Sequence, residues 1–387
     1  MQKKTPTQSI TNTSNAKASL AMRLVCLFWI AAKLIGWRVW LKERLFPVAP
    51  VFEWCDWPAA MHYILFVCSL GAIALLFFKP FSKTMLIALV IVELLSCIAD
   101  QNRWQPWQYQ YLFTAVICLI NFKEAKKIIG CIAFVMAATY LYSGIGKLNE
   151  GYLVLVWDNI FLKKIFKLSE AAYQANSIHY LGYATAVTEI FVAIGLFFAK
   201  TKKAAAYGMI AMHLLILYAI GPLGINYNSI VWPWNVLMII LLYILFIKKE
   251  PAQINFNWLW QGWNKLVLVC WGIMPALNYA GLWDSYLSSR LYSGGLPLMV
   301  LCVKDGNEKE ELQPYFSKTD TYNLCNGDAM ANLQTWAMKE MNVPPYPELR
   351  VYKKAEGQWR KSHPNTTTGF VYYYISRQKE AKRIENK

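Results

Sequence analysis

Residues 128–149, IIGCIAFVMAATYLYSGIGKLN, decide the fold class of this chain. Positions 128–146 carry no charged side chain, and an apolar stretch of this length is typical of a membrane-spanning helix. The stretch ends at Lys147, and the two glycines just before that lysine favour close packing against a second helix. It therefore predicts a packed membrane helix with a cation at its end.

Similar apolar runs recur along the chain, several of them near the short limit of about 17 residues for a spanning helix. They cover about 20–41, 59–78, 84–99, 107–122, 128–146, 177–199, 204–221, 229–247 and 266–283. The basic residues after the first run, with no small-residue cleavage site, favour an uncleaved anchor over a signal peptide. We therefore expect about nine spans.

The composition agrees with a membrane protein. Hydrophobic residues make up 56% of the chain and charged residues 16%, whereas about a quarter of a soluble domain is charged. Seventeen tryptophans and 23 tyrosines fit rings that line membrane interfaces. The composition excludes soluble, disordered and collagen-like classes. The predicted fold class is an all-α polytopic membrane helix bundle with a small C-terminal α+β extracytoplasmic domain.

Three regions follow from the pattern. We expect residues 1–18 to be a disordered cytoplasmic N-terminus, 19–284 to form the bundle, and 285–387 to form a small unit that leans on the bundle. Within that unit the residue types predict strands, a helix and a charged tail. The strands are expected at 297–303, 349–353 and 369–375, the helix at 329–341 and the tail at 377–387.

The net charge of +16 is best explained by membrane topology. A nucleic-acid-binding protein would need a basic face on a folded surface, whereas these lysines stand in short clusters between apolar runs. With a cytoplasmic N-terminus, each cluster falls on the cytoplasmic side, as the positive-inside rule requires. The clusters are Lys3/Lys4/Lys17, Lys79/Lys83, Lys123/Lys126/Lys127, Lys200/Lys202/Lys203 and Lys248/Lys249. An odd number of spans then places 284–387 outside, on a protein of the inner (plasma) membrane.

The nine cysteines show no metal-ligand spacing, so no metal is predicted. Most stand in apolar runs, where cysteine behaves as a small hydrophobic residue. Cys302 and Cys325 can pair if their unit is extracytoplasmic.

Ionisable and amide side chains in or near spans are functional by default. Those singled out are Glu93, Asp100, Asn102, Arg103, Lys147, Glu189, His213, Asn226, Asn228 and Asn235. Under the predicted topology, Asp100, Arg103, Lys147 and the 226–235 stretch gather near the outer surface. We therefore expect an outward-facing polar pocket.

Each of these residues also has a structural interpretation. Lys147 can extend to lipid headgroups. If it is held instead in an apolar pocket, its pKa would be lowered and it could act as a general base. A carboxylate partner, Glu189 or Asp100, would oppose that shift by favouring the charged form. Glu93 and Glu189 have two possible functional roles, as proton relays or as counter-ions of Lys147 and Arg103. In the structural interpretation they form interhelical hydrogen bonds. The lone His213 is more typical of a hydrogen-bonded helix contact than of a ligand. The 100–107 stretch also suits an interfacial aromatic loop.

Two motifs carry a resemblance to a known family. The run YLYSGIGKLNEGYL (140–153), followed by TEIFVAIGLFF (188–198) and a span with a central histidine, resembles the vitamin K-dependent γ-glutamyl carboxylases. More broadly it is similar to the bacterial HTTM proteins and to the neighbouring DoxX-like proteins. The resemblance covers roughly 20–283.

The resemblance implies roles for particular residues. The lysine of its short motif is catalytic, which corresponds to Lys147, followed here by Leu148 and Asn149. Asp100 and Asn102 correspond to its aspartate loop, in which Arg103 stands where the carboxylases have a histidine. Glu189 corresponds to its acidic residue.

The implied chemistry uses a reduced isoprenoid quinone and a periplasmic protein or peptide substrate. Lys147, Arg103 and Glu189 would be catalytic. The pocket residues would be Asp100, Asn102, Asn149, His213, Asn226, Asn228 and Asn235.

Two other functions fit the same sequence. A non-catalytic, redox-associated DoxX-like scaffold would dock a periplasmic partner through its C-terminal unit. A transporter is the other, although no clear internal repeat is present.

Overall fold

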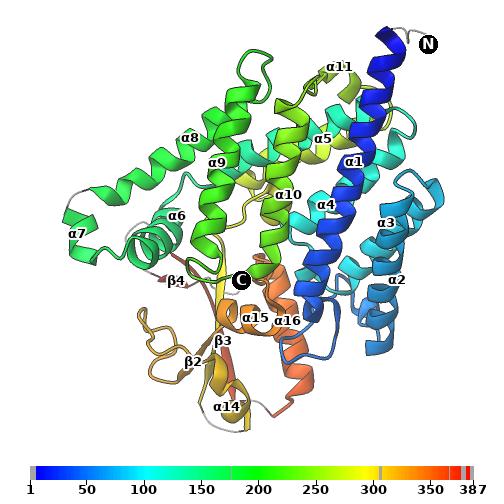
Figure 1. Ribbon diagram of the computed structural model, residues 1–387. Coiled ribbons are helices and arrows are strands. Elements are labelled where there is room, and N and C mark those ends of the chain that lie inside the picture. The colour runs from blue at the N-terminus through cyan, green and yellow to red at the C-terminus, as the bar shows by residue number, and fades with distance from the viewer. Residues whose placement is uncertain (1–5, 176, 305–306, 366, 376–380, 384–387) are drawn as a thin grey trace.

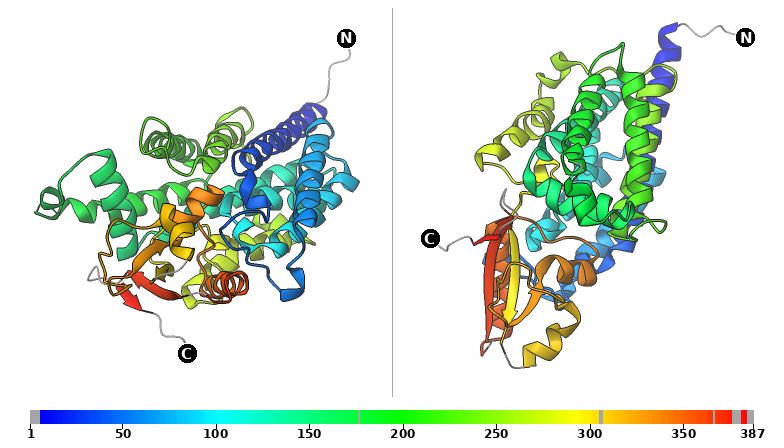
Figure 2. Two further views of the ribbon diagram at one scale, coloured as in Figure 1. Left: turned by 90° about the horizontal axis from the view of Figure 1, so that it is seen from below. Right: turned by 90° about the vertical axis from the view of Figure 1, so that its left-hand side faces the viewer.

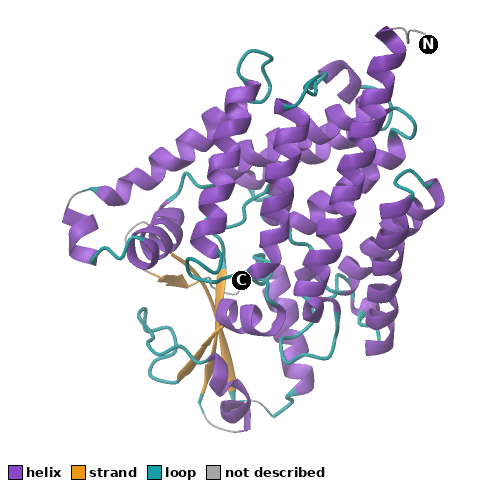
Figure 3. Cartoon of the chain, viewed as in Figure 1, coloured by secondary structure: helices purple, strands orange, loops and turns teal. Residues whose placement is uncertain are grey.

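The computed structural model describes residues 6–175, 177–304, 307–365, 367–375 and 381–383. The chain is mostly helical, and its strands gather at one end (Figure 3). The main helices are α1 (Pro6–Ile35), α2 (Ala59–Phe78), α3 (Lys83–Ala99), α4 (Pro106–Ile120), α5 (Ala125–Gly146), α8 (Leu181–Gly195), α9 (Lys202–Ile220) and α10 (Trp232–Leu242), which η7 (Tyr243–Ile247) continues.

Shorter helical segments join these helices. They are η1 (Trp37–Trp40), η3 (Gln101–Arg103), α6 (Glu150–Tyr152), η4 (Leu153–Ile165), α7 (Glu170–Ala175), η5 (Ile178–Tyr180), α11 (Phe256–Leu259), α12 (Asn264–Leu268), η8 (Val269–Ile273) and α13 (Met274–Leu277).

Six helices within the described residues are long and apolar enough to cross a membrane. They cover Thr13–Ile35, Ala59–Phe78, Ala125–Gly146, Ile178–Gly195, Lys202–Ile220 and Ser229–Ile247. Large apolar side chains on α8 and α9, such as Phe191 and Leu214, are exposed, as on a surface that lipid covers. α5 is the most enclosed of the six, with 78% of its most apolar 18-residue stretch buried.

The other three predicted spans are helical but short. α3 has 17 residues and α4 has 15, at or below the limit of about 17 for a straight crossing. The last one is divided into α12, η8 and α13. Proline at the first position of α4 suits a helix start, because its missing N–H is not needed there.

The loops form two groups at opposite ends of the bundle. Near the N-terminus, Lys17 Nζ donates to Glu250 O at 2.7 Å, and Lys202 Nζ donates to Ala252 O at 2.8 Å. Three of the segments predicted to be cytoplasmic therefore meet there. The N-terminus and the C-terminal unit lie at opposite ends in Figure 1.

The C-terminal unit is built on an antiparallel sheet with the strand order β2-β1-β3-β4. Its strands are β1 (Leu298–Val303), β2 (Ala329–Asn332), β3 (Thr368–Ile375) and β4 (Ala381–Arg383), and its helices are α14 (Asn307–Leu312), α15 (Leu333–Met341) and α16 (Leu349–Ser362). Figure 2 shows the sheet below the helices of the bundle. The core is continuous from bundle to unit, because Trp336 packs against Phe46 with ring centroids 5.1 Å apart.

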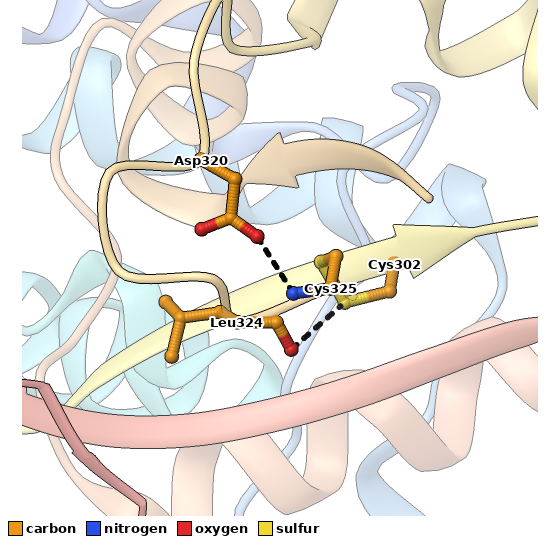
Figure 4. Close-up of a disulfide and its surroundings, with 4 residues drawn as sticks. All are labelled: Cys302, Asp320, Leu324 and Cys325. Atoms are coloured by element: carbon orange, nitrogen blue, oxygen red, sulfur yellow. Dashed lines mark hydrogen bonds between the residues drawn. A yellow bond between two sulfur atoms is a disulfide. The ribbon is translucent and has the colours of Figure 1, made fainter. Parts of the chain in front are cut away.

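Two expectations for this unit are confirmed by the structure. The predicted strands 297–303 and 369–375 are β1 and β3. Cys302 and Cys325 form a disulfide, with Asp320 accepting a hydrogen bond from Cys325 N at 2.7 Å (Figure 4).

Two expectations within the unit are wrong. The predicted strand 349–353 is the start of α16, whose buried residues Val351, Ala355 and Trp359 recur every four positions, a helical period that five residues are too few to reveal. The predicted helix 329–341 begins only at Leu333, because its first four residues pair with β1 as β2 and Asn332 Oδ1 caps α15 by accepting from Thr335 N.

The expected disorder of residues 1–18 is also wrong for the residues that the structure describes. α1 begins at Pro6, and its polar first turns continue directly into the apolar part of the helix. Lys17 fixes this end to the 249–250 loop. Residues 1–5, and all of the predicted charged tail except β4, lie outside the described residues.

Candidate functional site: an apolar cavity with a buried ion pair

Close packing of α5 against α8 brings the two charged residues of the site together. A Cβ atom at Gly144 would lie 2.8 Å from Ile190 Cγ1 and 3.1 Å from the Ile190 backbone nitrogen. Only glycine therefore permits this approach. One turn later, Lys147 at the end of α5 meets Glu189 on α8.

Lys147 Nζ donates a hydrogen bond to Glu189 Oε2 and forms an ion pair with it. The Lys147 side chain is only 15% exposed and that of Glu189 only 6%. Burial lowers the pKa of Lys147, but the carboxylate of Glu189 outweighs burial and holds that pKa above its ordinary value. Of the two alternatives for a buried Lys147, the structure therefore has the one in which Glu189 favours the charged form: Lys147 is an ammonium group paired with a carboxylate.

His213 links two further helices beside this pair. Its Nδ1 lies 2.7 Å from Asn235 Oδ1, and its Nε2 lies 2.7 Å from the Tyr140 hydroxyl oxygen. The amide oxygen can only accept, so Nδ1 carries a proton and donates it to Asn235, while Nε2 and the Tyr140 hydroxyl share the second hydrogen bond. His213 is thus a hydrogen-bonded helix contact, the structural role that a lone histidine favours.

These side chains line one cavity of about 300 Å³. Its lining is mainly apolar, and the polar side chains named above are part of it. Phe166 and Leu215 also line it and are 54% and 52% exposed, so the cavity reaches the outer apolar surface of the bundle. An apolar pocket with few convergent polar groups is the usual form of a small-molecule site.

Asn149 supports the cavity from outside. Its Oδ1 accepts from Tyr152 N at 3.0 Å and caps α6, while its Nδ2 donates to Gly146 O and to Ser293 O at 2.7 and 2.9 Å. Asn149 thus fixes the loop after Lys147 to the 293–295 segment. Its predicted place in the pocket is replaced by this structural role.

Asn226 and Asn228 shape the turn between α9 and α10. Both have left-handed backbone, with φ of 47° and 50°, a conformation that asparagine tolerates better than most residues. Asn228 Nδ2 donates to the Tyr292 hydroxyl, and Tyr292 lines the cavity.

Asp100, Asn102 and Arg103 form a separate buried network and do not line the cavity. Asp100 accepts from Arg44, from Ala49 N at 3.1 Å and from Asn102 Nδ2 at 2.9 Å. Burial raises the pKa of Asp100, but Arg44 and Arg103 outweigh it and hold that pKa below its ordinary value.

The guanidinium group of Arg103 is hydrogen-bonded mostly to neutral acceptors. It donates to the carbonyls of Val39, Trp40 and Ser96 at 2.7–3.0 Å and lies 2.6 Å from His62 Nδ1. Burial holds the pKa of Arg103 below its ordinary value, at about 10.

The loop that carries this network also holds the C-terminal unit. Asn102 Oδ1 accepts from Tyr346 N at 3.1 Å, Gln105 Nε2 donates to Pro344 O at 3.0 Å, and Arg350 donates to Gln101 Oε1 at 2.9 Å. The dense polar content of 100–105 is therefore accounted for by domain docking. The sequence predicted one pocket that contains Asp100 and Arg103 together with Lys147. The structure instead separates the network around Asp100 from the cavity that Lys147 lines.

Glu93 belongs to neither group. It pairs with Lys33 at 3.1 Å and accepts from Gln108 at 2.7 Å, with both charged side chains fully buried. Lys33 was missed by sequence reasoning although it stands inside the first apolar run, and the rule that intramembrane charges have partners was the signal that could have found it. Arg44, the partner of Asp100, lies outside the runs and gave no comparable signal.

Compared with protein-family models, with characterised proteins and with solved structures, the chain gives no match.

Proposed function

We propose that this protein is a multi-pass membrane enzyme of the HTTM/carboxylase-like type, which binds a reduced isoprenoid quinone or a similar lipid in the apolar cavity and transfers a proton at the Lys147–Glu189 pair. One observation carries the proposal: a nearly buried ammonium–carboxylate pair stands on the wall of an apolar cavity that opens to the side of the bundle. Ionisable pairs are costly in such surroundings, so their presence favours function.

The membrane orientation in this proposal has a cytoplasmic N-terminus, nine spans and an extracytoplasmic C-terminal unit. Two observations support it. The lysine-rich loops at Lys17, Lys202 and 248–252 meet at the end opposite the sheet, as the positive-inside rule favours. The Cys302–Cys325 disulfide belongs to the other end, and disulfides persist in oxidising compartments such as the periplasm.

The cavity suits the proposed ligand in shape and chemistry. Its aromatic and aliphatic walls, including Trp157, Phe161 and Trp234, match an apolar ring and the start of an isoprenoid chain. The rest of the isoprenoid chain would extend past Phe166 and Leu215 into the lipid. A reduced quinone bound there would supply a weakly acidic hydroxyl group.

The pair divides the proton chemistry between its two members. Glu189 is the acceptor available in the resting ion pair, and Lys147 places a positive charge where an oxyanion would develop. Lys147 acts as the base itself only after its proton has moved to Glu189. His213 lines the same cavity, and its two ring nitrogens are held by Tyr140 and Asn235.

The test is lipid mass spectrometry of protein purified in mild detergent. We expect quinone or a related isoprenoid to co-purify with the wild type, and Ser143→Phe, which fills the cavity, to lose it. Gly71→Phe is the matched control, because nothing lies within 4 Å of a Cβ at Gly71 on α2. Equal recovery from all three proteins would overturn the cavity assignment.

A second measurement separates binding from chemistry. Glu189→Gln keeps a hydrogen-bond acceptor for Lys147, so we expect lipid recovery to be retained while quinol-dependent turnover is lost. Retained turnover in this variant and in Lys147→Met would remove the pair from the chemistry, whereas no quinol-dependent turnover in the wild type would favour the non-catalytic scaffold.

A further inference from the structure

A second cavity of about 790 Å³ lies between η4 and the C-terminal unit. We call it the chamber. Its lining includes seven tyrosines together with serine, threonine and amide side chains. Lys163 and Lys164 line it and are exposed, so the chamber opens to water. In Figure 1 the helical segment that begins at α6 passes beside the sheet.

The chamber and the apolar cavity share a wall of single side chains. Four residues line both: Val156, Ile160, Leu291 and Tyr292. The first three are aliphatic, and Tyr292 is the largest of the four and alone carries a polar group. The wall therefore separates a polar space that opens to water from the space that holds the Lys147–Glu189 pair.

Tyr292 is held firmly in this wall. Its hydroxyl accepts a hydrogen bond from Asn228 Nδ2, and Asn228 is only 2% exposed. Its backbone is left-handed, with φ of 55°, which costs conformational energy in a non-glycine residue. A bulky residue keeps such a conformation only where its surroundings fix it.

The surroundings that fix Tyr292 lead back to the ion pair. Gly294 and Gly295 also have positive φ, of 61° and 59°, and a Cβ at Gly294 would lie 2.1 Å from Gly151 C. This close backbone contact, with the Asn149–Ser293 hydrogen bond, joins the Tyr292 segment to the loop that follows Lys147.

We propose that Tyr292 is a positioning and specificity-determining residue: its ring is the partition that keeps water of the chamber out of the apolar cavity and limits how far a cavity ligand extends. The partition rests on the shared wall and on the anchored ring, and it does not depend on which lipid the cavity binds. For the function proposed above, it would keep the pair in a dry site, where its electrostatic effect is strongest.

Thiol labelling with a charged, water-soluble thiosulfonate tests the partition directly. The reporters are Ser143→Cys in the cavity and Thr321→Cys in the chamber, each in a Cys68→Ala background because Cys68 is an exposed free cysteine. We expect the chamber reporter to react at least about tenfold faster than the cavity reporter, since the cavity excludes water.

Variants of Tyr292 then assign the effect to its ring. Tyr292→Ala should raise the labelling rate of the cavity reporter about tenfold, towards that of the chamber reporter, whereas Tyr292→Phe, which keeps the ring, should not. Tyr322→Ala is the matched control, because Tyr322 lines only the chamber. If Tyr292→Ala fails to fold, Tyr292→Leu gives a smaller opening and a smaller increase.

Three results would overturn the proposal. They are equal rates for both reporters in the wild type, an unchanged cavity rate in folded Tyr292→Ala and Tyr292→Leu, or the same increase in Tyr322→Ala. Failure of the proposed function would be seen separately, as absence of a co-purified isoprenoid with the labelling pattern intact.

Discussion

Lys147 at the carboxyl end of α5 donates a hydrogen bond to Glu189 in the middle of α8, and both side chains face the same apolar cavity. The two residues are 42 positions apart in the chain. Their pairing depends on the close approach of two helices at Gly144.

Removing one member of this pair should destabilise the protein more than removing both. Lys147→Met leaves the Glu189 carboxylate without its partner, which costs about 3–5 kcal/mol for a buried pair. Lys147→Met combined with Glu189→Leu replaces the pair by apolar groups and should recover most of that loss. Thermal unfolding of the two single variants and the double variant in one detergent gives the coupling. Additive losses would show that the two charges are not coupled.

The close approach at Gly144 should tolerate no side chain. In Gly144→Ala the new methyl group would push Ile190 and α8 away, so we expect a lower unfolding temperature and reduced lipid recovery. Gly71→Ala is the matched control: its methyl group meets nothing within 4 Å, and alanine is better than glycine inside a helix by about 1 kcal/mol. Equal unfolding temperatures for the two variants would contradict the packing.

Asp100 should make the protein sensitive to acid. Burial raises its pKa, but Arg44 and Arg103 outweigh burial and lower it in the folded state. The unfolded chain therefore binds a proton first, and the stability that Asp100 contributes is present above the unfolded pKa of about 3.9 and is lost as pH falls through the lower folded pKa.

Unfolding temperatures between about pH 5 and pH 3 would measure this loss. We expect the wild type to fall further over that range than Asp100→Asn, which is less stable than the wild type at neutral pH because Arg44 loses its counter-ion. Parallel curves for the two proteins would count against the assignment.

The Cys302–Cys325 disulfide should stabilise the C-terminal unit. Its cysteines are 23 positions apart, and closing a loop of this size contributes about 3 kcal/mol in the chain-entropy account. The double variant Cys302→Ser/Cys325→Ser should be cleaved faster by protease within 303–324. Cys68→Ser, at an exposed free cysteine, should match the wild type. Free thiols at both positions in membrane-purified protein would refute the bond.

The helical part of the fold follows largely from the sequence, because long apolar runs with few charges record the length of each helix directly. The runs 59–78, 84–99 and 128–146 differ from α2, α3 and α5 by no more than three residues at either end. Errors concentrate in the C-terminal unit, where short elements such as β2 are set by pairing with β1 and carry no pattern of their own.

The site was predictable only in part. The glycines before Lys147 and the acidic residue in the 188–198 run pointed to one pair, since charges in spans need partners. The separation of Asp100, Asn102 and Arg103 from that pair was not predictable, because it depends on Arg44 and on residues 344–350, which lie far away along the chain. Topology places polar groups at one end of a bundle, but it does not tell which of them meet.

The docking of 344–350 onto the 100–105 loop has a consequence for how the protein is made. The amides of Asn102 and Gln105 are buried, yet each has a partner at Tyr346 or Pro344, which is translated 244 or 239 residues later. Until residues 344–346 have been made, these two hydrogen bonds are missing at this end of the inserted bundle. A chain that stops short of residue 344 would carry that defect permanently, and membrane quality-control proteases would have a physical feature by which to recognise it.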